Sequence, residues 1–162
     1  MLHISPLRDD SLAEFKKLFC DYYNELGCED DCAHLLDEYI MPDLLAGLIK
    51  IDFMRSDGEP AGFIIYQIDD IDNEWNFKES WADIREIYVV PSLRRSGAGL
   101  LLLYTAEMKL REAGATQSYA LPSEDAVPFF EKCGYTATDE YNPDLDCKVY
   151  IKTNIHNTCN HK

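Results

Sequence analysis

One tight turn constrains the fold of this chain more than any other feature. The apolar, β-branched run from Ile84 to Val90 predicts a buried strand, and the stretch from Gly99 to Gly114 predicts a helix. Arg94 to Gly99 joins them and reads Arg-Arg-Ser-Gly-Ala-Gly. Glycines let backbone N–H groups approach a ligand closely, and the start of a helix attracts negative charge. With two arginines beside it, this turn predicts a site for phosphate or diphosphate.

The spacing of the glycines excludes two common phosphate-binding motifs. A dinucleotide fingerprint needs a third glycine, and a Walker loop needs Lys-Ser/Thr after its last glycine. The sequence instead reads Val-x-Pro-x-x-Arg-x-x-Gly-x-Gly from Val89 to Gly99. This pattern resembles the acetyl-CoA diphosphate loop of the GNAT superfamily of acyl-CoA-dependent N-acyltransferases, in which Arg94, Gly97 and Gly99 fill the characteristic places.

Two further segments support the resemblance, which covers residues 47 to 140. Ala126 to Tyr135 is similar to the family's Ala-x-x-Phe-Tyr-Glu-Lys-x-Gly-Phe motif, and Asp57 to Phe63 is similar to its turn and third strand. The resemblance implies an α/β fold with a mixed, mostly antiparallel central sheet. Its fourth and fifth strands splay apart, and helices flank both faces. We expect one domain over residues 1–154, followed by a polar tail over residues 155–162.

Composition limits the partners and the location. The net charge of −15 argues against nucleic acid or an anionic membrane. The acidic surface either favours a cationic acceptor or simply keeps the protein soluble. No apolar run reaches the roughly 20 residues of a membrane span, and the first residues lack the pattern of a secretory signal. The six cysteines are irregularly spaced. We therefore expect reduced thiols in a cytoplasmic protein, and no metal site.

Periodicity and turn residues predict the remaining elements. Ser11 to Glu14 fits a capping box at the start of the first helix. A second helix is expected from Asp30 to Ile40, ending before Pro42. Asp125 is expected to cap a late helix, because Pro128 then lies in its first turn. Asp69 to Ser80 is too acidic for the core, so it is either a solvated loop or one wall of an acceptor pocket. The other expected strands are Leu2–Ile4, Leu48–Arg55, Ala61–Ile68, Gln117–Leu121, Tyr135–Glu140 and Cys147–Thr153.

The resemblance also implies which residues bind acetyl-CoA, the expected co-substrate. Ser123 stands where many relatives have an Asn that contacts the pantetheine arm. A backbone N–H near Val89 is the expected donor to the developing oxyanion. The residues expected at the pantetheine arm are Ile87, Tyr88 and Val89, and those at the diphosphate are Arg94, Arg95, Ser96, Gly97, Ala98, Gly99 and Leu100.

Two functions fit these residues. The first is an N-acetyltransferase in which a primary amine of a small molecule or peptide attacks acetyl-CoA directly, with Glu86 as the base. Alternatively, Glu86 is an ordinary strand-end carboxylate. The second function is a degenerate domain that binds acyl-CoA as a sensor or scaffold, which Phe130 favours because it replaces the family's frequent tyrosine acid.

Several residues are candidates for the remaining roles. Tyr135, Tyr119, Cys133 or solvent could supply the missing proton. The resemblance also makes a homodimer possible, because many members of the family dimerise. The acceptor is not identified by the sequence, and the residues that either line its pocket or serve ordinary packing and surface roles are Tyr22, Tyr23, Glu25, His34, Trp75 and Tyr141.

Overall fold

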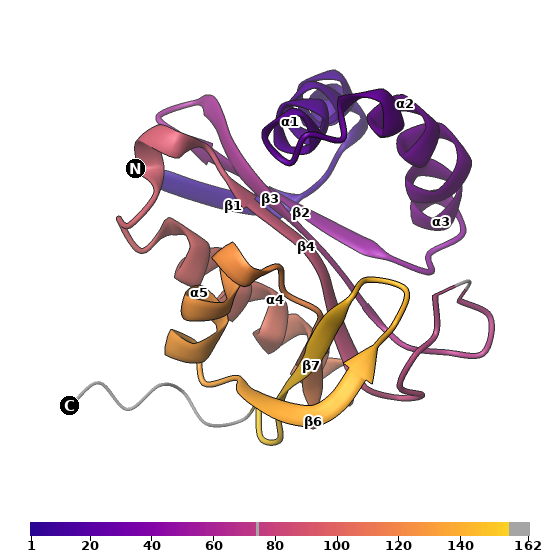
Figure 1. The fold of residues 1–162 in the computed structure, drawn as a ribbon. Coiled ribbons are helices and arrows are strands. Elements are labelled where there is room, and N and C mark those ends of the chain that lie inside the picture. The colour runs from indigo at the N-terminus through magenta and orange to yellow at the C-terminus, as the bar shows by residue number, and fades with distance from the viewer. Residues whose placement is uncertain (74, 156–162) are drawn as a thin grey trace. The chain divides into compact units, whose positions relative to one another are not determined.

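The computed structural model describes residues 1–73 and 75–155 and contains a mixed sheet with the strand order β1-β2-β3-β4-β5-β7-β6 (Figure 1). Together with its flanking helices, the sheet confirms the predicted α/β class. The strands are β1 Leu2–Pro6, β2 Lys50–Ser56, β3 Glu59–Ile68, β4 Ala82–Val89, β5 Ser118–Ala120, β6 Thr136–Asn142 and β7 Cys147–Lys152. The α-helices are α1 Leu12–Glu25, α2 Cys32–Leu35, α3 Met41–Leu45, α4 Ala98–Glu112 and α5 Val127–Lys132.

The chain divides into two compact units. The first contains Met1–Ile65 and Glu86–Leu103, and the second contains Tyr66–Arg85 and Tyr104–Lys162. Strands β3 and β4 and helix α4 contribute residues to both units. Within the described residues, no helix has the length and apolar character that crossing a membrane requires.

In the first unit, β1 pairs antiparallel with β2, and a tight hairpin joins β2 to β3. Asp57 and Gly58 form its turn with φ angles of 49° and 91°. Positive φ at both central residues is the geometry of a two-residue hairpin loop. The turn therefore sets the register between β2 and β3, whose central residues are buried in consecutive runs.

The core of the first unit lies between its helices and its strands. Phe15, Leu18 and Phe19 of α1 are buried against apolar residues of β2, β3 and β4. The rings of Phe15 and Phe63 meet edge to face with their centroids 5.2 Å apart. These contacts fix the face of α1 that points toward β4. The other buried members of the cluster are Cys32, Leu36, Ile40, Ile49, Ile51, Phe53, Ile65 and Tyr88.

A close backbone approach explains the glycine inside β3. A Cβ added to Gly62 would lie 2.4 Å from the carbonyl oxygen of Tyr88 and 3.3 Å from a methyl carbon of Leu102. Glycine inside a strand often marks such an approach by another backbone. Leu102 belongs to α4, so the second turn of α4 packs against β3.

In the second unit, β4 pairs with β5 in parallel, as predicted, through Ala82–Ser118, Asp83–Tyr119 and Ile84–Ala120. β5 pairs antiparallel with β7, and β7 with β6. The buried carboxylate of Glu107 accepts hydrogen bonds from Tyr135 at 2.9 Å and from Lys152 at 2.9 Å. Both oxygens of this buried acid therefore have partners.

Asp69 corrects the expectation that the β3–β4 connection is too acidic to be buried. Its side chain is only 1% exposed. One oxygen accepts the backbone N–H groups of Phe77 and Lys78, each at 2.8 Å, and the Tyr119 hydroxyl at 2.6 Å. These bonds offset the cost of burying the charge, so Asp69 organises the loop from inside.

Three helix predictions need correction. Pro42 lies in the first turn of α3, where its missing N–H does no harm, and the preceding turn from Leu36 to Ile40 is a π-helix. Ser11 makes no side-chain cap hydrogen bond and instead donates to Asp10. Asp125 lies inside a 3-10 turn that precedes α5, so it is not the cap.

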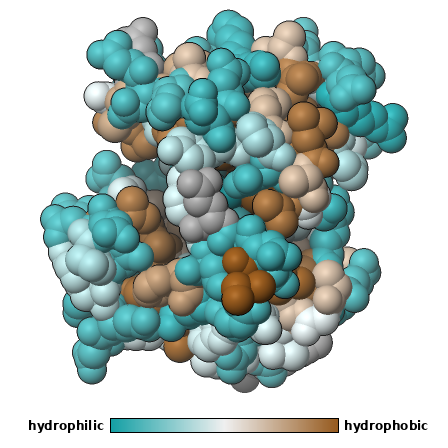
Figure 2. Space-filling view, turned by 90° about the vertical axis from the view of Figure 1, so that its right-hand side faces the viewer, coloured by the Kyte–Doolittle hydropathy of each residue, from teal (hydrophilic) through white to brown (hydrophobic). Residues whose placement is uncertain are grey.

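The molecular surface is largely polar on the side shown in Figure 2, where smaller groups of hydrophobic residues interrupt the hydrophilic ones. At the C-terminal end, Ile155 is buried and its N–H donates to the Thr116 carbonyl at 3.3 Å. The rest of the expected polar tail, residues 156–162, lies outside the described residues.

Candidate functional site

The predicted anion-binding turn lies in the first unit, between β4 and α4. A 3-10 turn from Pro91 to Leu93 leads into it, and α4 begins at Ala98. Gly97 has a φ of 91°, and a Cβ added there would meet no atom within 4 Å. The space beside Gly97 is therefore open to a ligand. The residues expected at the diphosphate, Arg94 to Leu100, are brought together here as one exposed loop and the first turn of a helix.

Arg94 is held at the end of β4. Its Nε donates to the Val89 carbonyl at 2.9 Å, and its Nη2 donates to Glu25 at 2.6 Å. The guanidinium also lies over the Tyr88 ring, 5.5 Å from its centroid. Three contacts thus fix the guanidinium, while Nη1 retains further donors. A planar group with charge and spare donors is suited to a phosphate oxygen.

Glu25 joins Arg94 to Tyr88. One Glu25 oxygen accepts the Arg94 bond, and the other accepts the Tyr88 hydroxyl at 2.5 Å. Burial acts to raise the pKa of Glu25, but the hydrogen bonds from Tyr88 and Arg94 outweigh it and lower the pKa. Burial and the neighbouring carboxylate raise the pKa of Tyr88 to about 12, so its hydroxyl stays protonated and donates.

Glu86 is held by two tyrosines of α1. Tyr22 donates to one carboxylate oxygen at 2.6 Å, and Tyr23 donates to the other at 3.1 Å. Burial, followed by the charge of Glu86, raises the pKa of Tyr22 well above its ordinary value. The side chain of Glu86 is half-buried, so its carboxylate lies at the edge of the core with its orientation fixed.

An aromatic cluster positions the two tyrosines. Tyr23 stacks on Phe19 at 4.7 Å, and Tyr22 contacts Tyr88 at 5.3 Å between ring centroids. Aromatic pairs at such separations add to the stability that burial provides. The end of α1, the end of β4 and the loop are therefore connected through side chains of one unit.

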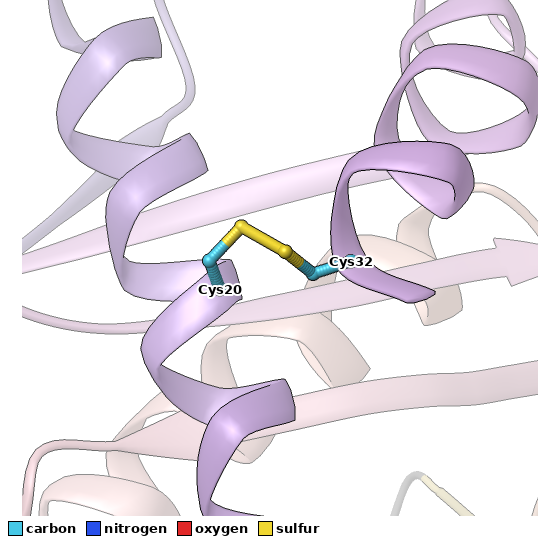
Figure 3. Close-up of a disulfide and its surroundings, with 2 residues drawn as sticks. All are labelled: Cys20 and Cys32. Carbon is cyan, nitrogen blue, oxygen red and sulfur yellow. A yellow bond between two sulfur atoms is a disulfide. The ribbon is translucent and has the colours of Figure 1, made fainter. Parts of the chain in front are cut away.

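A disulfide corrects the prediction that the cysteines are reduced. Cys20 of α1 and Cys32 of α2 are bonded, with their Cα atoms 5.4 Å apart (Figure 3). The bond ties α2 to the helix that carries Tyr22, Tyr23 and Glu25. Among the residues that the structure describes, Cys28, Cys133 and Cys147 are not part of a disulfide.

The candidates for a general acid lie in the second unit and are poorly suited to the role. Phe130 is buried and has no acidic proton. Tyr135 donates to Glu107, and burial with that carboxylate raises its pKa well above the ordinary value. Burial and the nearby Asp83 do the same for Tyr119, and Cys133 is buried.

The remaining sequence candidates occupy other places. Ser123 precedes the 3-10 turn before α5, in the second unit. In the same unit, Trp75 lies under the Arg85 guanidinium at 4.4 Å, and Tyr141 is exposed. His34 belongs to α2 and meets the Tyr39 ring edge to face at 5.8 Å.

A family model decides what kind of protein this is. The model of the acetyltransferase (GNAT) family matches residues 12–135, which include the loop and Glu86. The chain belongs to the GNAT family. A GNAT protein with these features is an acyltransferase, and its predicted family is confirmed.

Similar proteins agree with this assignment. A protein of Lactobacillus delbrueckii subsp. lactis described as an uncharacterized N-acetyltransferase is 28% identical over 150 residues, which cover 85% of this chain and 86% of the relative. The PaiA N-acetyltransferase of Thermoplasma acidophilum, solved with coenzyme A, matches with a TM-score of 0.76 at 15% identity, over 94% of this chain and 99% of that one. An aminoglycoside acetyltransferase, also solved with coenzyme A, matches with a TM-score of 0.73 at 16% identity, over 94% of this chain and 95% of that one. At these identities the structural matches show the shared GNAT fold.

Sequence reasoning missed the hydrogen-bond partners of Glu86, Tyr88 and Arg94. Tyr22, Tyr23 and Glu25 were expected as lining or packing residues, but not as hydrogen-bond partners of Glu86, Tyr88 and Arg94. Their i, i+3 spacing on α1 places Tyr22 and Glu25 on one face, which is the available signal. Gly62 inside a predicted strand was a second signal, since it marks the approach of the Tyr88 backbone.

Proposed function

We propose that this protein is an acetyl-CoA-dependent N-acetyltransferase that acts on a primary amine of a small molecule or peptide. The loop at the start of α4 is the observation that carries the proposal. It combines an open space beside Gly97, two arginines and the N-terminus of a helix that begins at Ala98. Such a turn suits the diphosphate of coenzyme A because backbone N–H groups and the helix dipole both favour negative charge.

The residues assigned to acetyl-CoA follow the loop and the end of β4. Arg94, Arg95, Ser96, Gly97, Ala98, Gly99 and Leu100 are assigned to the diphosphate, and Ile87, Tyr88, Val89 and Ser123 to the pantetheine arm. Acetyl-CoA supplies the activated acyl group when bound. The Val89 backbone N–H is assigned to the oxygen on which negative charge develops.

Glu86 is assigned as the base that takes the proton of the attacking ammonium, directly or through water. Its two oxygens accept hydrogen bonds from Tyr22 and Tyr23, which orient the carboxylate. A fixed carboxylate at the edge of the core suits a base because its position costs no reorganisation during the reaction. The surplus of acidic residues, with a net charge of −15, favours a cationic acceptor.

We further propose that the enzyme is cytoplasmic and that it forms a homodimer. The Cys20–Cys32 disulfide bears on the location, because cytosolic reductants keep most thiols reduced. Alkylation of the thiols at the moment of cell lysis measures whether this pair is oxidised in the cell. A fully oxidised pair would contradict the cytoplasmic assignment.

Release of free coenzyme A from acetyl-CoA, measured with polyamines, aminoglycosides, amino acids and short peptides, tests the proposed reaction. Glu86→Gln is expected to lower kcat by about 10²- to 10⁴-fold, the usual contribution of a general base, while acetyl-CoA still binds. Glu38→Gln, an exposed carboxylate of the first unit, is the matched control and should keep full activity. Full activity of Glu86→Gln would remove Glu86 from the mechanism.

One observation favours the second function, a domain that binds acyl-CoA without turnover. The position of the usual tyrosine acid holds the buried Phe130, and the nearby Tyr135 hydroxyl is engaged with Glu107. The same assay separates the two functions. Tight binding of acetyl-CoA without release of coenzyme A for any amine would favour the sensor or scaffold.

A further inference from the structure

The loop between β4 and α4 holds a backbone conformation that residues other than glycine rarely adopt. Arg95 has a φ of 61°, and Gly97 follows with a φ of 91°. A non-glycine residue at such an angle costs free energy and persists only when its surroundings hold it there. The contacts that hold Arg95 are therefore part of how this loop is made ready for a ligand.

Side chains on both sides of Arg95 anchor the loop. On one side, Ser96 donates its hydroxyl to the Leu93 carbonyl at 2.6 Å. On the other side, Arg94 donates from Nε to the Val89 carbonyl at 2.9 Å and from Nη2 to Glu25 at 2.6 Å. The Ser96 and Val89 bonds link the loop to itself and to the strand before it. Glu25 belongs to a distant segment of the sequence, the end of α1.

The position of Glu25 in its helix points to the same role. Glu25 is the last residue of α1, where the helix dipole disfavours a carboxylate and favours a cation. Tyr88 and Arg94 offset this cost, since each donates to one Glu25 oxygen. The Tyr88 bond fixes the carboxylate, and the carboxylate in turn fixes the guanidinium.

We propose that Glu25 is a positioning residue for acetyl-CoA binding, which acts through Arg94 to hold the diphosphate loop in its ligand-binding conformation. This inference rests on the proposed function, because it takes the loop to bind the diphosphate. It adds a residue of α1 to a diphosphate site otherwise built from the loop and the start of α4. Glu25 itself contacts the arginine and not the ligand.

The test compares two ligands that differ in the group the loop is proposed to hold. Glu25→Gln loses the charge and one of the two hydrogen bonds. Because the Glu25–Arg94 pair is partly exposed, the affinity of this variant for acetyl-CoA is expected to fall by about two- to fivefold. Acetyl-pantetheine carries the same thioester without the diphosphate. KM for this truncated substrate should be the same for the wild type and Glu25→Gln.

Glu14→Gln is the matched control. Glu14 also lies on α1 and pairs with an arginine, Arg55, at the opposite end of the helix. Breaking that pair should alter stability by a similar amount and leave the affinity for acetyl-CoA unchanged. Tyr88→Phe, which frees the other Glu25 oxygen, is the second variant and should weaken acetyl-CoA binding by about threefold.

A double-mutant cycle with Arg94→Met decides whether Glu25 acts through Arg94. If it does, Glu25→Gln will have no further effect on acetyl-CoA affinity in the Arg94→Met background. Two results would overturn the inference while the proposed function stands. One is that the losses of acetyl-CoA affinity in the two single variants add up in the double variant. The other is that Glu25→Gln weakens the binding of acetyl-CoA and acetyl-pantetheine equally. Failure of the wild-type protein to bind acetyl-CoA would overturn both.

Discussion

Replacing Gly62 by alanine tests the packing that positions β4. The added Cβ would lie 2.4 Å from the Tyr88 carbonyl oxygen, whereas ordinary contacts begin near 3.4 Å, so one strand must move by the difference of 1.0 Å. That movement is opposed, because the Val90 N–H donates to the Ala61 carbonyl at 3.0 Å and ties the two strands together at adjacent positions. We therefore expect a steric cost at the upper end of what overpacking usually costs, about 3 kcal/mol.

Urea unfolding measures this cost, and thermal unfolding should show a fall in Tm of about 6–12 °C for a chain of this size. Because Glu86, the proposed base, lies on the same strand as Tyr88, a displaced β4 should also lower kcat. The double variant with Leu102→Ala identifies the clashing atom. A smaller combined loss would assign part of the cost to the Leu102 side chain, whereas additive losses would assign it to the two nearer atoms, the Tyr88 carbonyl oxygen and the Met54 methyl carbon at 3.1 Å. A free energy of unfolding for Gly62→Ala within 0.5 kcal/mol of the wild-type value would refute the reasoning.

Three further predictions concern stability. Reduction of Cys20–Cys32, which closes a loop with a sequence separation of 12, should lower the free energy of unfolding by about 3 kcal/mol, and a Cys20→Ser/Cys32→Ser variant should show the same loss with no response to dithiothreitol. Lys152→Met leaves the buried Glu107 carboxylate without its cation and should cost about 3–5 kcal/mol in urea unfolding, whereas adding Glu107→Gln should recover part of that loss. The pKa of the Tyr88 hydroxyl is raised from 10.0 to about 12. The stability that this protonated hydroxyl contributes is therefore fully present below pH 10 and is lost as the pH rises through 12. The fall in unfolding free energy over that range should be less steep in Tyr88→Phe, and an unchanged slope would contradict the assignment.

Local signals in the sequence were sufficient to predict the loop and most elements. The strand before the loop, the helix after it and the parallel pairing of β4 with β5 follow from apolar periodicity and from the connection by a helix. Helix boundaries near prolines were predicted less well. The π-helix before Pro42 and the 3-10 turn before Pro128 both let a proline enter a helix, and neither has a distinct sequence pattern.

Partners that lie far apart in the sequence could not be predicted. The bonds from Tyr22 and Tyr23 to Glu86, and from Arg94 to Glu25, depend on which face of α1 meets β4. The Cys20–Cys32 disulfide depends on the packing of two helices. Asp69 is buried because backbone N–H groups of its own loop and the hydroxyl of the distant Tyr119 donate to it. Each of these follows from tertiary packing, which single-segment patterns do not report.

Calorimetric titration with acetyl-CoA of Gly97→Glu tests the central claim, that the turn before α4 binds the diphosphate. Gly114→Glu is the matched control, because Gly114 also has a positive φ, 104°, and open space, and lies at the other end of α4. Both variants carry the same added charge and a similar backbone strain. The wild type and Gly114→Glu should bind acetyl-CoA, and Gly97→Glu should show no binding heat while remaining folded. Binding of Gly97→Glu with wild-type affinity would contradict the claim.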